Sequence, residues 1–500
     1  MSLAPVVCPN RKGKLLRLAV LAVPLCLPAA PSPAQTADPQ VLSVSELAKL
    51  VADQGRALEA QRQEIEALRK QLEETTQLSL SAHNRLEELA KAAPAPTVSA
   101  AVEERLEKIE ASVQQIPDVP EDVVSAGDFP GSIRIPGTDV GLRVGGLVRT
   151  TGVATLGALG TEDRFVTSSI PVAGSQEAGK EPRFVLTAIP SRFNLDLRTP
   201  TGVGAMRAFI EGDFAGSSRV FRLRHAYGQW QGFVIGQTWS TFADPEAEPD
   251  GIDFEGLNAI ALFRQPLVRY THGLGERFSL AAALENPAPD ITNATGVSQV
   301  PDLVVRARWR PQEGYKGPLG KVFRKNAHVN FAFLFRQIRG EPLDQPNTTL
   351  STSGFGVGLS GRVTAPWQAE KGQVTFSAYA GSGIGRYITD LGTLGGQDAF
   401  YDSATNTIDA LPVFAWYLGY ERRWSSDLRS TFTYGTVIVD NIDPQPGDAF
   451  HMTNRWSVNL TWSPIPRLDL VGEFLFGNRI DKDGQRGASS QLQLGTNFRF

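Results

Sequence analysis

The stretch that decides the fold is Gln491-Leu492-Gln493-Leu494-Gly495-Thr496-Asn497-Phe498-Arg499-Phe500, with which the chain ends. Its residues alternate, so that Leu492, Leu494, Phe498 and Phe500 share one face of a strand and polar groups share the other. An outer-membrane barrel needs lipid-facing apolar groups, lumen-facing polar groups and aromatic residues at the membrane interface. The ending therefore predicts the closing strand of such a barrel.

The first residues predict a secreted protein, as an outer-membrane barrel requires. Four cations between positions 11 and 17 precede an apolar run and a small-residue stretch that ends at Ala34. This pattern is typical of a cleaved secretory signal, here residues 1–34. Both cysteines, Cys8 and Cys26, would leave with it, so we expect neither disulfides nor thiol redox chemistry in the mature chain.

Composition and charge argue against nucleic-acid binding and against membrane-spanning helices. The chain has 49 basic and 53 acidic residues and a net charge of −4, which gives no footprint of nucleic-acid binding. After the signal, no window holds the roughly 18 uninterrupted apolar residues that a membrane-spanning helix requires. Any crossing of the membrane must therefore be made by strands.

A heptad pattern follows the signal. Its two apolar series are Val44, Val51, Leu58, Ile65, Leu72 and Leu86, broken at Ser79, and the half-polar Leu47, Gln54, Gln61, Leu68, Thr75, Ala82 and Leu89. Such a pattern predicts an α-helical coiled coil within residues 35–93, and hence an oligomer. The alternative is a single amphipathic helix folded back on a partner domain.

Residues 94–140 are expected to connect this helix to the barrel. Pro94 and Pro96 stop the coiled coil, and apolar residues between 102 and 116 predict a short second helix. The stretch 117–139 is rich in Pro, Gly and Asp and predicts a linker, with one short strand around Ile133.

The remainder, residues 141–500, consists of alternating segments. They lie at 141–155, 191–199, 205–214, 220–231, 233–240, 258–272, 277–286, 301–311, 327–339, 353–364, 372–383, 413–424, 428–439, 451–463, 467–477 and 489–500. Single-chain barrels have an even number of strands, and about sixteen leave a water-filled channel. The predicted fold is an all-β transmembrane β-barrel of about 16 antiparallel strands, preceded by an N-terminal α-helical coiled coil.

Several segments reveal which face meets water, because an arginine at mid-membrane costs too much to face lipid. In one strand Arg306 and Arg308 share a side, and in another Arg222 and Arg224 face inward while Phe221 and Leu223 face outward. Other arginines also fall on the polar side of their strands: Arg198, Arg207, Arg423, Arg429 and Arg499. The sequence predicts a basic lumen, although part of this set could serve as wall salt bridges or rim charges.

A long acidic loop separates the fifth and sixth segments, over residues 241–253. Its carboxylates are Asp244, Glu246, Glu248, Asp250 and Asp253. If the loop folds into the lumen, they would oppose the wall arginines and set a transverse field that orients charged solutes. The alternative is that an acidic, proline-containing loop is solvated surface.

Ordered motifs between residues 190 and 270 resemble the DcaP-like porin family. They include Arg222-Leu223-Arg224-His225-Ala226-Tyr227-Gly228 and Gly236-Gln237-Thr238-Trp239-Ser240-Thr241-Phe242, with further matches at 190–200, 210–214, 253–256, 264–265 and 268–270. The text after Asp244 departs from the family pattern.

The resemblance implies a trimeric outer-membrane porin, a passive diffusion channel for small hydrophilic solutes, chiefly anions such as dicarboxylates. It also implies a periplasmic coiled coil that holds the trimer, with membrane lipid and anionic solutes as partners. The motif positions that could line the pore are Arg192, Arg198, Glu211, Asp213, Arg222, Arg224, Gln237, Asp244, Arg264 and Arg269. The loop carboxylates and Arg207, Arg306 and Arg308 complete the candidate pore-lining set.

Two other functions stay open. An outer-membrane enzyme would need a nucleophile, a base and an acid near one strand edge, but the five histidines have no metal-ligand spacing with one another. The run 356–361 matches a dinucleotide-binding pattern without the βαβ unit that would confirm it, and instead fits a crowded barrel or trimer contact. We expect no catalysis, metal or cofactor. The stronger alternative is a structural barrel that tethers the envelope through the coiled coil.

Overall fold

The structure is a computed structural model that describes residues 125–175, 179, 181–216, 219–311, 326–365, 367 and 372–500. The predicted signal peptide, coiled coil and second helix lie outside these residues. All described residues belong to one compact unit, Asp118–Phe500. A short strand, β1 (Ile133–Arg134), lies at the position where the linker was expected to contain one.

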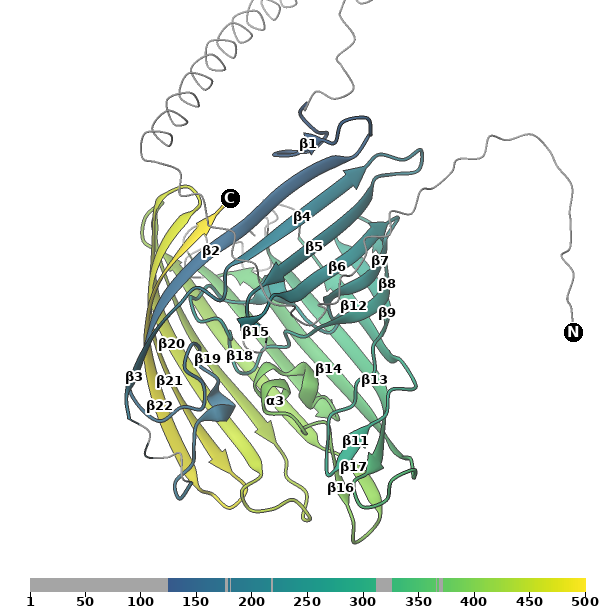
Figure 1. Cartoon of the computed structure of the whole chain (residues 1–500), viewed down its shortest axis with the longest axis vertical. Helices are drawn as coiled ribbons and strands as arrows, with labels where there is room; N and C mark the ends of the chain where they lie inside the picture. Colours follow the sequence, from purple (N-terminus) through teal and green to yellow (C-terminus); the bar gives the residue numbers. More distant parts are fainter. Residues whose placement is uncertain are drawn as a thin grey trace, which may run out of the picture. The chain divides into compact units, whose positions relative to one another are not determined.

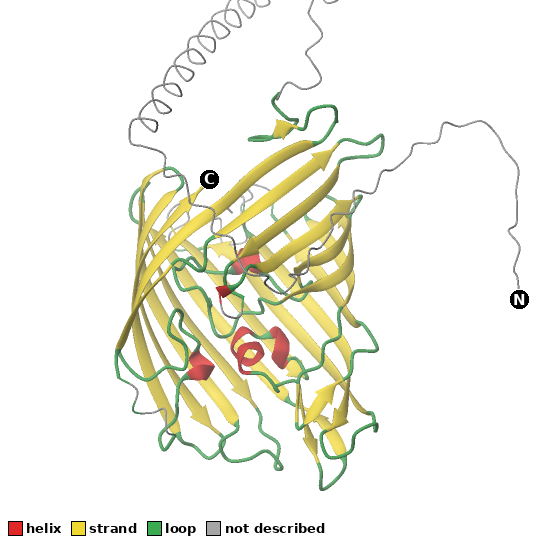
Figure 2. Cartoon of the chain, in the orientation of Figure 1, coloured by secondary structure: helices red, strands yellow, loops and turns green. Residues whose placement is uncertain are grey.

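The unit is a closed antiparallel barrel (Figures 1 and 2). Its wall strands are β2 (Gly141–Thr155), β3 (Arg183–Thr187), β4 (Arg192–Thr199), β5 (Met206–Asp213), β6 (Arg222–Trp230), β7 (Phe233–Trp239), β8 (Arg264–Leu274), β9 (Phe278–Glu285), β12 (Asp302–Trp309), β13 (His328–Pro342), β14 (Leu350–Thr364), β15 (Gly372–Ser382), β18 (Pro412–Arg423), β19 (Leu428–Val439), β20 (Phe450–Ile465), β21 (Leu468–Asp481) and β22 (Arg486–Arg499). Strand β2 pairs with β22 on one side and with β3 and β4, in succession, on the other. Because β3 and β4 share one position, the wall has sixteen positions, as the sequence predicts.

The alternation of side chains follows the prediction. Phe331, Phe333 and Phe335 are 55%, 40% and 46% exposed on the outer face of β13, whereas Arg336 is fully buried. On β20, Val458, Leu460 and Trp462 face outward, and Arg455, Ser457, Asn459 and Thr461 face inward. No helix in the described part of the chain is long and apolar enough to span a membrane.

Connections at one end of the barrel are long, and three of them fold inward. We name them loop A (156–182), which contains the 3-10 turn η1 (Thr167–Ser169), loop B (240–263), which contains η3 (Pro245–Ala247), and loop C (383–411). Loop C contains η4 (Gly385–Tyr387), α3 (Thr389–Leu394), β16 (Ala399–Asp402) and β17 (Thr407–Ala410). Strands β16 and β17 form a small sheet with β10 (Ile291–Thr292), and β11 (Ala294–Gly296) pairs with β13. We call this end the loop end, and the end with the C-terminus and the opposite connections the turn end (Figure 1).

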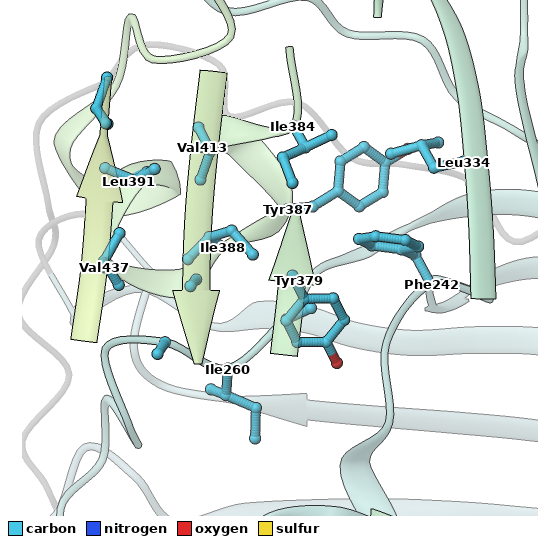
Figure 3. Close-up of a cluster of buried hydrophobic side chains, with 14 of the residues drawn as sticks. Phe242, Ile260, Leu334, Tyr379, Ile384, Tyr387, Ile388, Leu391, Val413 and Val437 are labelled. Atoms are coloured by element: carbon cyan, nitrogen blue, oxygen red, sulfur yellow. The ribbon is translucent and has the colours of Figure 1, made fainter. Parts of the chain in front are cut away.

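The inward loops build an apolar core inside the barrel. Phe242 and Ile260 of loop B pack with Tyr387 and Leu391 of loop C and with the wall residue Tyr379 (Figure 3). The segment predicted from residue 258 therefore begins only at Arg264, because the apolar run 259–263 is buried in this core and not in a strand.

Glycines of β14 make room for that core. A Cβ on Gly356 would lie 2.8 Å from Ile384, and one on Gly358 would lie 2.7 Å from Tyr379. The small residues of 356–361 thus serve a crowded contact within the barrel.

Candidate functional site

Loop B is anchored to the wall from its first turn. The carboxylate of Asp244 lies 3.0 Å from Nε2 of His328 on β13, accepts a 2.8 Å hydrogen bond from Ser360 on β14, and lies 3.3 Å from Arg308 on β12. Burial alone would raise the pKa of Asp244, but the hydrogen bond with His328 and the charge of Arg308 lower it to about 2. Asp244 is therefore ionised and holds three strands to the loop.

Further contacts carry the loop across the barrel to the last strands. The Tyr417 hydroxyl donates to the Ala247 carbonyl at 2.8 Å, Arg429 pairs with Asp250 at 2.6 Å, and Arg455 pairs with Asp253 at 2.8 Å. At the far end, the backbone N–H of Ile252 donates to the Glu473 carboxylate at 2.7 Å. Loop B thus follows the wall from β12 to β22 and reaches β2, where Arg149 donates to the carbonyl of Ile252 at 3.4 Å. It leaves the inner face of β4 to β8 opposite it.

A buried ion network fixes loop C. Arg336 of β13 lies 2.8 Å from Asp398 of loop C and 3.3 Å from Asp302 of β12, and all three side chains are fully buried. Tyr387 donates its hydroxyl to Asp302 at 2.7 Å. Loop C in turn supports loop B, because the N–H of Thr389 donates to the carbonyl of Ile260 at 3.0 Å. The two loops form one inner body.

A cavity of about 1110 Å³ lies between this body and the wall. Its lining contains twelve arginines: Arg149, Arg164, Arg192, Arg222, Arg224, Arg264, Arg362, Arg386, Arg423, Arg429, Arg455 and Arg499. It contains eight carboxylates: Glu211, Glu248, Asp250, Asp253, Glu255, Glu421, Asp469 and Glu473. Cations therefore outnumber anions around the cavity.

A β-bulge shapes the basic wall. Glu211 pairs in register with His225 and Gly212 with Leu223, so Arg224 is the extra residue and both Arg224 and His225 are buried on the inner face. Arg224 lies 2.8 Å from both Glu211 and Asp213, and Arg222 lies 2.8 Å from Asp213. Wall carboxylates thus neutralise most of the charge of these two arginines.

Three other arginines are less committed. Arg149 donates to the side-chain oxygen of Asn497 at 2.7 Å, Arg192 stands 3.8 Å from Glu211, and the guanidinium of Arg264 lies 4.3 Å above the ring of Trp239. Among the described residues, Arg149 and Arg264 have no ion-pair partner within 4 Å. Arg362 also lines the cavity without an ion pair among the described residues, but it donates to Gln373 at 3.4 Å and to the backbone carbonyl of Glu248 at 2.7 Å. Arg149, Arg192 and Arg264 are therefore weakly paired cations that keep charge available to a solute.

Glu248 of loop B faces this group. Burial raises the pKa of Glu248, while the charges of Arg149, Arg192, Arg224 and Arg264 act to lower it. In the part of the chain that the structure describes, its carboxylate has neither a hydrogen bond nor an ion pair, although its backbone carbonyl accepts a 2.7 Å hydrogen bond from Arg362. The arrangement places one unpaired carboxylate opposite three weakly paired guanidinium groups.

About half of the candidate pore-lining residues predicted from the sequence line the cavity. Its lining includes Arg192, Glu211, Arg222, Arg224, Glu248, Asp250, Asp253 and Arg264. Outside that lining lie Arg198, Arg207, Asp213, Gln237, Asp244, Glu246, Arg269, Arg306 and Arg308. Several of these fix the scaffold: Arg308 pairs with both Asp244 and Glu246, and Arg306 donates to the carbonyl of Ala243 at 3.4 Å.

Sequence reasoning missed several lining residues. Arg149 lies two positions from the inward-facing Leu147 and Thr151, so the alternation of β2 could have revealed it. Arg386 and Tyr387 reach the cavity from loop C, and no periodic signal marks an inward loop. In the described ranges, no group of three or more His, Cys, Asp or Glu could hold a metal ion.

A family model described as DcaP outer membrane protein matches residues 158–500, whereas no curated protein matches the chain. Among solved structures, the outer membrane channel DcaP of Acinetobacter baumannii is 22% identical, with a TM-score of 0.61, 72% of this chain covered and 97% of that chain covered. An anion-selective porin from Comamonas acidovorans is 11% identical, with a TM-score of 0.48 and coverages of 72% and 100%. OmpT of Vibrio cholerae is 11% identical, with a TM-score of 0.45 and coverages of 73% and 99%.

Proposed function

Because the chain belongs to the DcaP outer membrane protein family, we propose that it is a passive outer-membrane channel for small hydrophilic solutes, with a preference for anions such as dicarboxylates. The solved DcaP channel supports the same barrel fold. The family and the fold favour a channel over an enzyme.

The observation that carries the anion preference is the group Arg149, Arg192 and Arg264 beside the cavity. Their charges are weakly paired, and a partly enclosed, low-dielectric site strengthens their attraction for a passing anion. Guanidinium groups bind carboxylates through two parallel hydrogen bonds, which suits a solute with carboxylate ends.

Loop B would narrow the path against this basic wall. Most of its carboxylates are occupied by anchoring pairs with wall arginines, and Glu248 alone among the five predicted ones lacks a pair. We propose that Glu248 and the three arginines set the transverse field at the narrowest part of the channel. The pore-lining role then belongs to the cavity residues, while Asp244, Glu246, Arg306 and Arg308 position the loop.

The remaining features of the proposal rest on the sequence and on general barrel architecture. The heptads of residues 35–93 support a homotrimer held by a coiled coil. Long loops of outer-membrane barrels are extracellular and short turns periplasmic, which would put the turn end and the coiled coil on the periplasmic side. The alternative, a tether with little conduction, would require the cavity to be sealed.

Single-channel recording with succinate tests the proposal. Wild-type channels should show current blockade by succinate, and Arg192→Ala with Arg264→Ala should weaken that blockade by roughly tenfold to a hundredfold, since each of the two lost charge-assisted hydrogen bonds contributes on the order of tenfold in affinity. Arg183→Ala is the matched control, because Arg183 pairs with the exposed Glu162 at the loop end. Folded wild-type protein without conductance would shift the weight to the tether.

A further inference from the structure

A second group of arginines surrounds one carboxylate on the inner wall, close to the turn end. Both oxygens of Asp196 on β4 are occupied: Arg198 donates to them at 3.1 and 2.8 Å, and Arg207 of β5 at 2.8 and 3.1 Å. Arg143 of β2 adds a third contact at 3.4 Å. Asp196 itself is fully buried, so three cations share one anion that has no further oxygen to offer.

The charges of this group do not balance. Among the described residues, none of the three arginines forms an ion pair with any carboxylate other than Asp196. Two positive charges are therefore in excess. The side chains of Arg143, Arg198 and Arg207 are 41%, 38% and 26% exposed, so an anion from the lumen can reach them.

Aromatic faces hold the guanidinium groups without neutralising them. Arg198 lies 4.3 Å from the ring centre of Phe129, and Arg143 lies 5.9 Å from the same ring. Arg207 lies 4.9 Å from the ring centre of Phe209 and donates to the hydroxyl of Tyr227 at 3.2 Å. Such contacts orient a cation while its charge stays available to a ligand.

The group borders the cavity beside loop B, because Phe209 and Tyr227, the two aromatic contacts of Arg207, line that cavity. None of Arg143, Arg198 and Arg207 lines that cavity. Arg192, which does, is six residues before Arg198 on β4, a separation of roughly 20 Å along an extended strand.

We infer that Arg143, Arg198 and Arg207, clustered around Asp196, form a second anion-binding subsite at the turn end of the lumen, which takes the carboxylate group of a small solute. The inference rests on the proposed channel function. Two subsites in series divide one long passage into shorter steps, and each binds weakly enough to release its anion to the next. The subsite would hold anions that enter from the turn end before they meet the arginines of the cavity.

Succinate added to one side of a single channel tests this subsite. We expect Arg143→Ala with Arg198→Ala to weaken blockade from the turn-end side by roughly tenfold to a hundredfold, because two charge-assisted contacts are lost. Blockade from the loop-end side should change less than about twofold, since an anion entering there meets the cavity arginines first. Thr348→Cys, on an exposed turn, identifies the loop-end side through reaction with an impermeant thiol reagent.

Control variants distinguish loss of the subsite from misfolding and from failure of the proposed channel function. Arg134→Ala removes a one-to-one pair with Asp128 outside the group and should leave blockade from both sides unchanged. Arg198→Lys keeps the charge but loses the fork geometry of the guanidinium, so it should weaken the turn-end blockade less than Arg198→Ala does, which guards against loss through misfolding. Unchanged turn-end blockade in the folded double variant would overturn the subsite. Absence of blockade from either side in the wild type would instead overturn the proposed function.

Discussion

The carboxylate of Asp244 lies 3.0 Å from Nε2 of His328, a residue 84 positions further along the chain, and both side chains are buried. The contact joins the first turn of loop B to the turn end of β13. Loop B lines the cavity, so this pair is one of the contacts that hold the cavity wall in place.

Asp244→Asn should loosen loop B. The substitution removes the charge that His328, Arg308 and Ser360 share, at a cost of about 2 kcal/mol for charge-assisted hydrogen bonds. We expect noisier and larger single-channel currents, measured in planar bilayers. Glu246→Gln should have a smaller effect on the currents, because Glu246 is half exposed and its pairs with Arg308 and Arg310 should contribute less than about 1 kcal/mol. Identical currents in Asp244→Asn and wild type would contradict the anchoring role.

The same pair predicts a pH dependence of stability. The pKa of Asp244 is lowered from 3.8 to about 2, so its ionised form stabilises the folded state above the ordinary pKa, and this contribution is lost as the pH falls through about 2. The difference in unfolding free energy between wild type and Asp244→Asn should therefore shrink between roughly pH 4 and 2. A difference that grows on acidification would be incompatible with this assignment.

Glu248 predicts that anion selectivity depends on pH. The change should occur at higher pH than the loss of stability expected for Asp244, because the pKa of Glu248 is raised and that of Asp244 is lowered. Burial raises the pKa of Glu248 above 4.5, so on acidification it loses its charge before an ordinary glutamate does. Anion preference should rise as the pH falls from 7 towards this raised pKa, and Glu248→Gln should show the higher preference throughout, without the step. Glu246→Gln should keep the step, because the Arg308 and Arg310 charges outweigh burial and lower the pKa of Glu246. Reversal potentials at several pH values measure the effect, and a step that survives in Glu248→Gln would rule it out.

Arg336→Ala should release loop C. The change leaves Asp398 buried without a cation and leaves Asp302 with Arg386 alone, at 3.7 Å, a loss of roughly 3–5 kcal/mol for a broken buried pair. Denaturant unfolding should report the lost stability, and the open-channel current should increase as loop C leaves the lumen. Arg134→Ala, at a pair with Asp128 whose side chains are 42% and 53% exposed, should change stability by less than about 1 kcal/mol. Equal effects of the two substitutions would count against the buried network as the anchor of loop C.

Gly356→Val should disturb the inner core while leaving the outer wall intact. Its Cβ would meet Ile384 at 2.8 Å, and overpacking of this kind costs about 1–3 kcal/mol. Val357→Leu, one position along on the lipid-facing side, should be tolerated. Unfolding midpoints of the two variants test the claim, and equal tolerance would show that β14 does not bear on loop C.

The positions of the strands along the chain were largely predictable, because successive residues of a barrel strand face lipid and lumen in alternation. The segment 428–439 coincides with β19, and 141–155 with β2. The inward loops were not predictable in the same way. The run 259–263 is as apolar as a strand, yet its side chains pack against Tyr387 inside the barrel, and periodicity alone cannot separate the two environments.

The sequence predicted that the candidate site is basic, but it did not predict which of its arginines form ion pairs. Alternation identifies inward arginines such as Arg222 and Arg308, but each turns out to have a carboxylate within 3.3 Å. Which arginines keep their charge available depends on contacts between distant segments, as with Arg149 beside Asn497. Those contacts follow from the closed barrel and the folded loops, and no local pattern encodes them.

The reversal potential of the mature wild-type protein, measured in planar bilayers under a salt gradient, tests the central claim most directly. A basic cavity beside loop B predicts stable conductance steps and a reversal potential of the sign that marks anion selectivity. A cation-selective potential, or folded protein that does not conduct, would contradict the account.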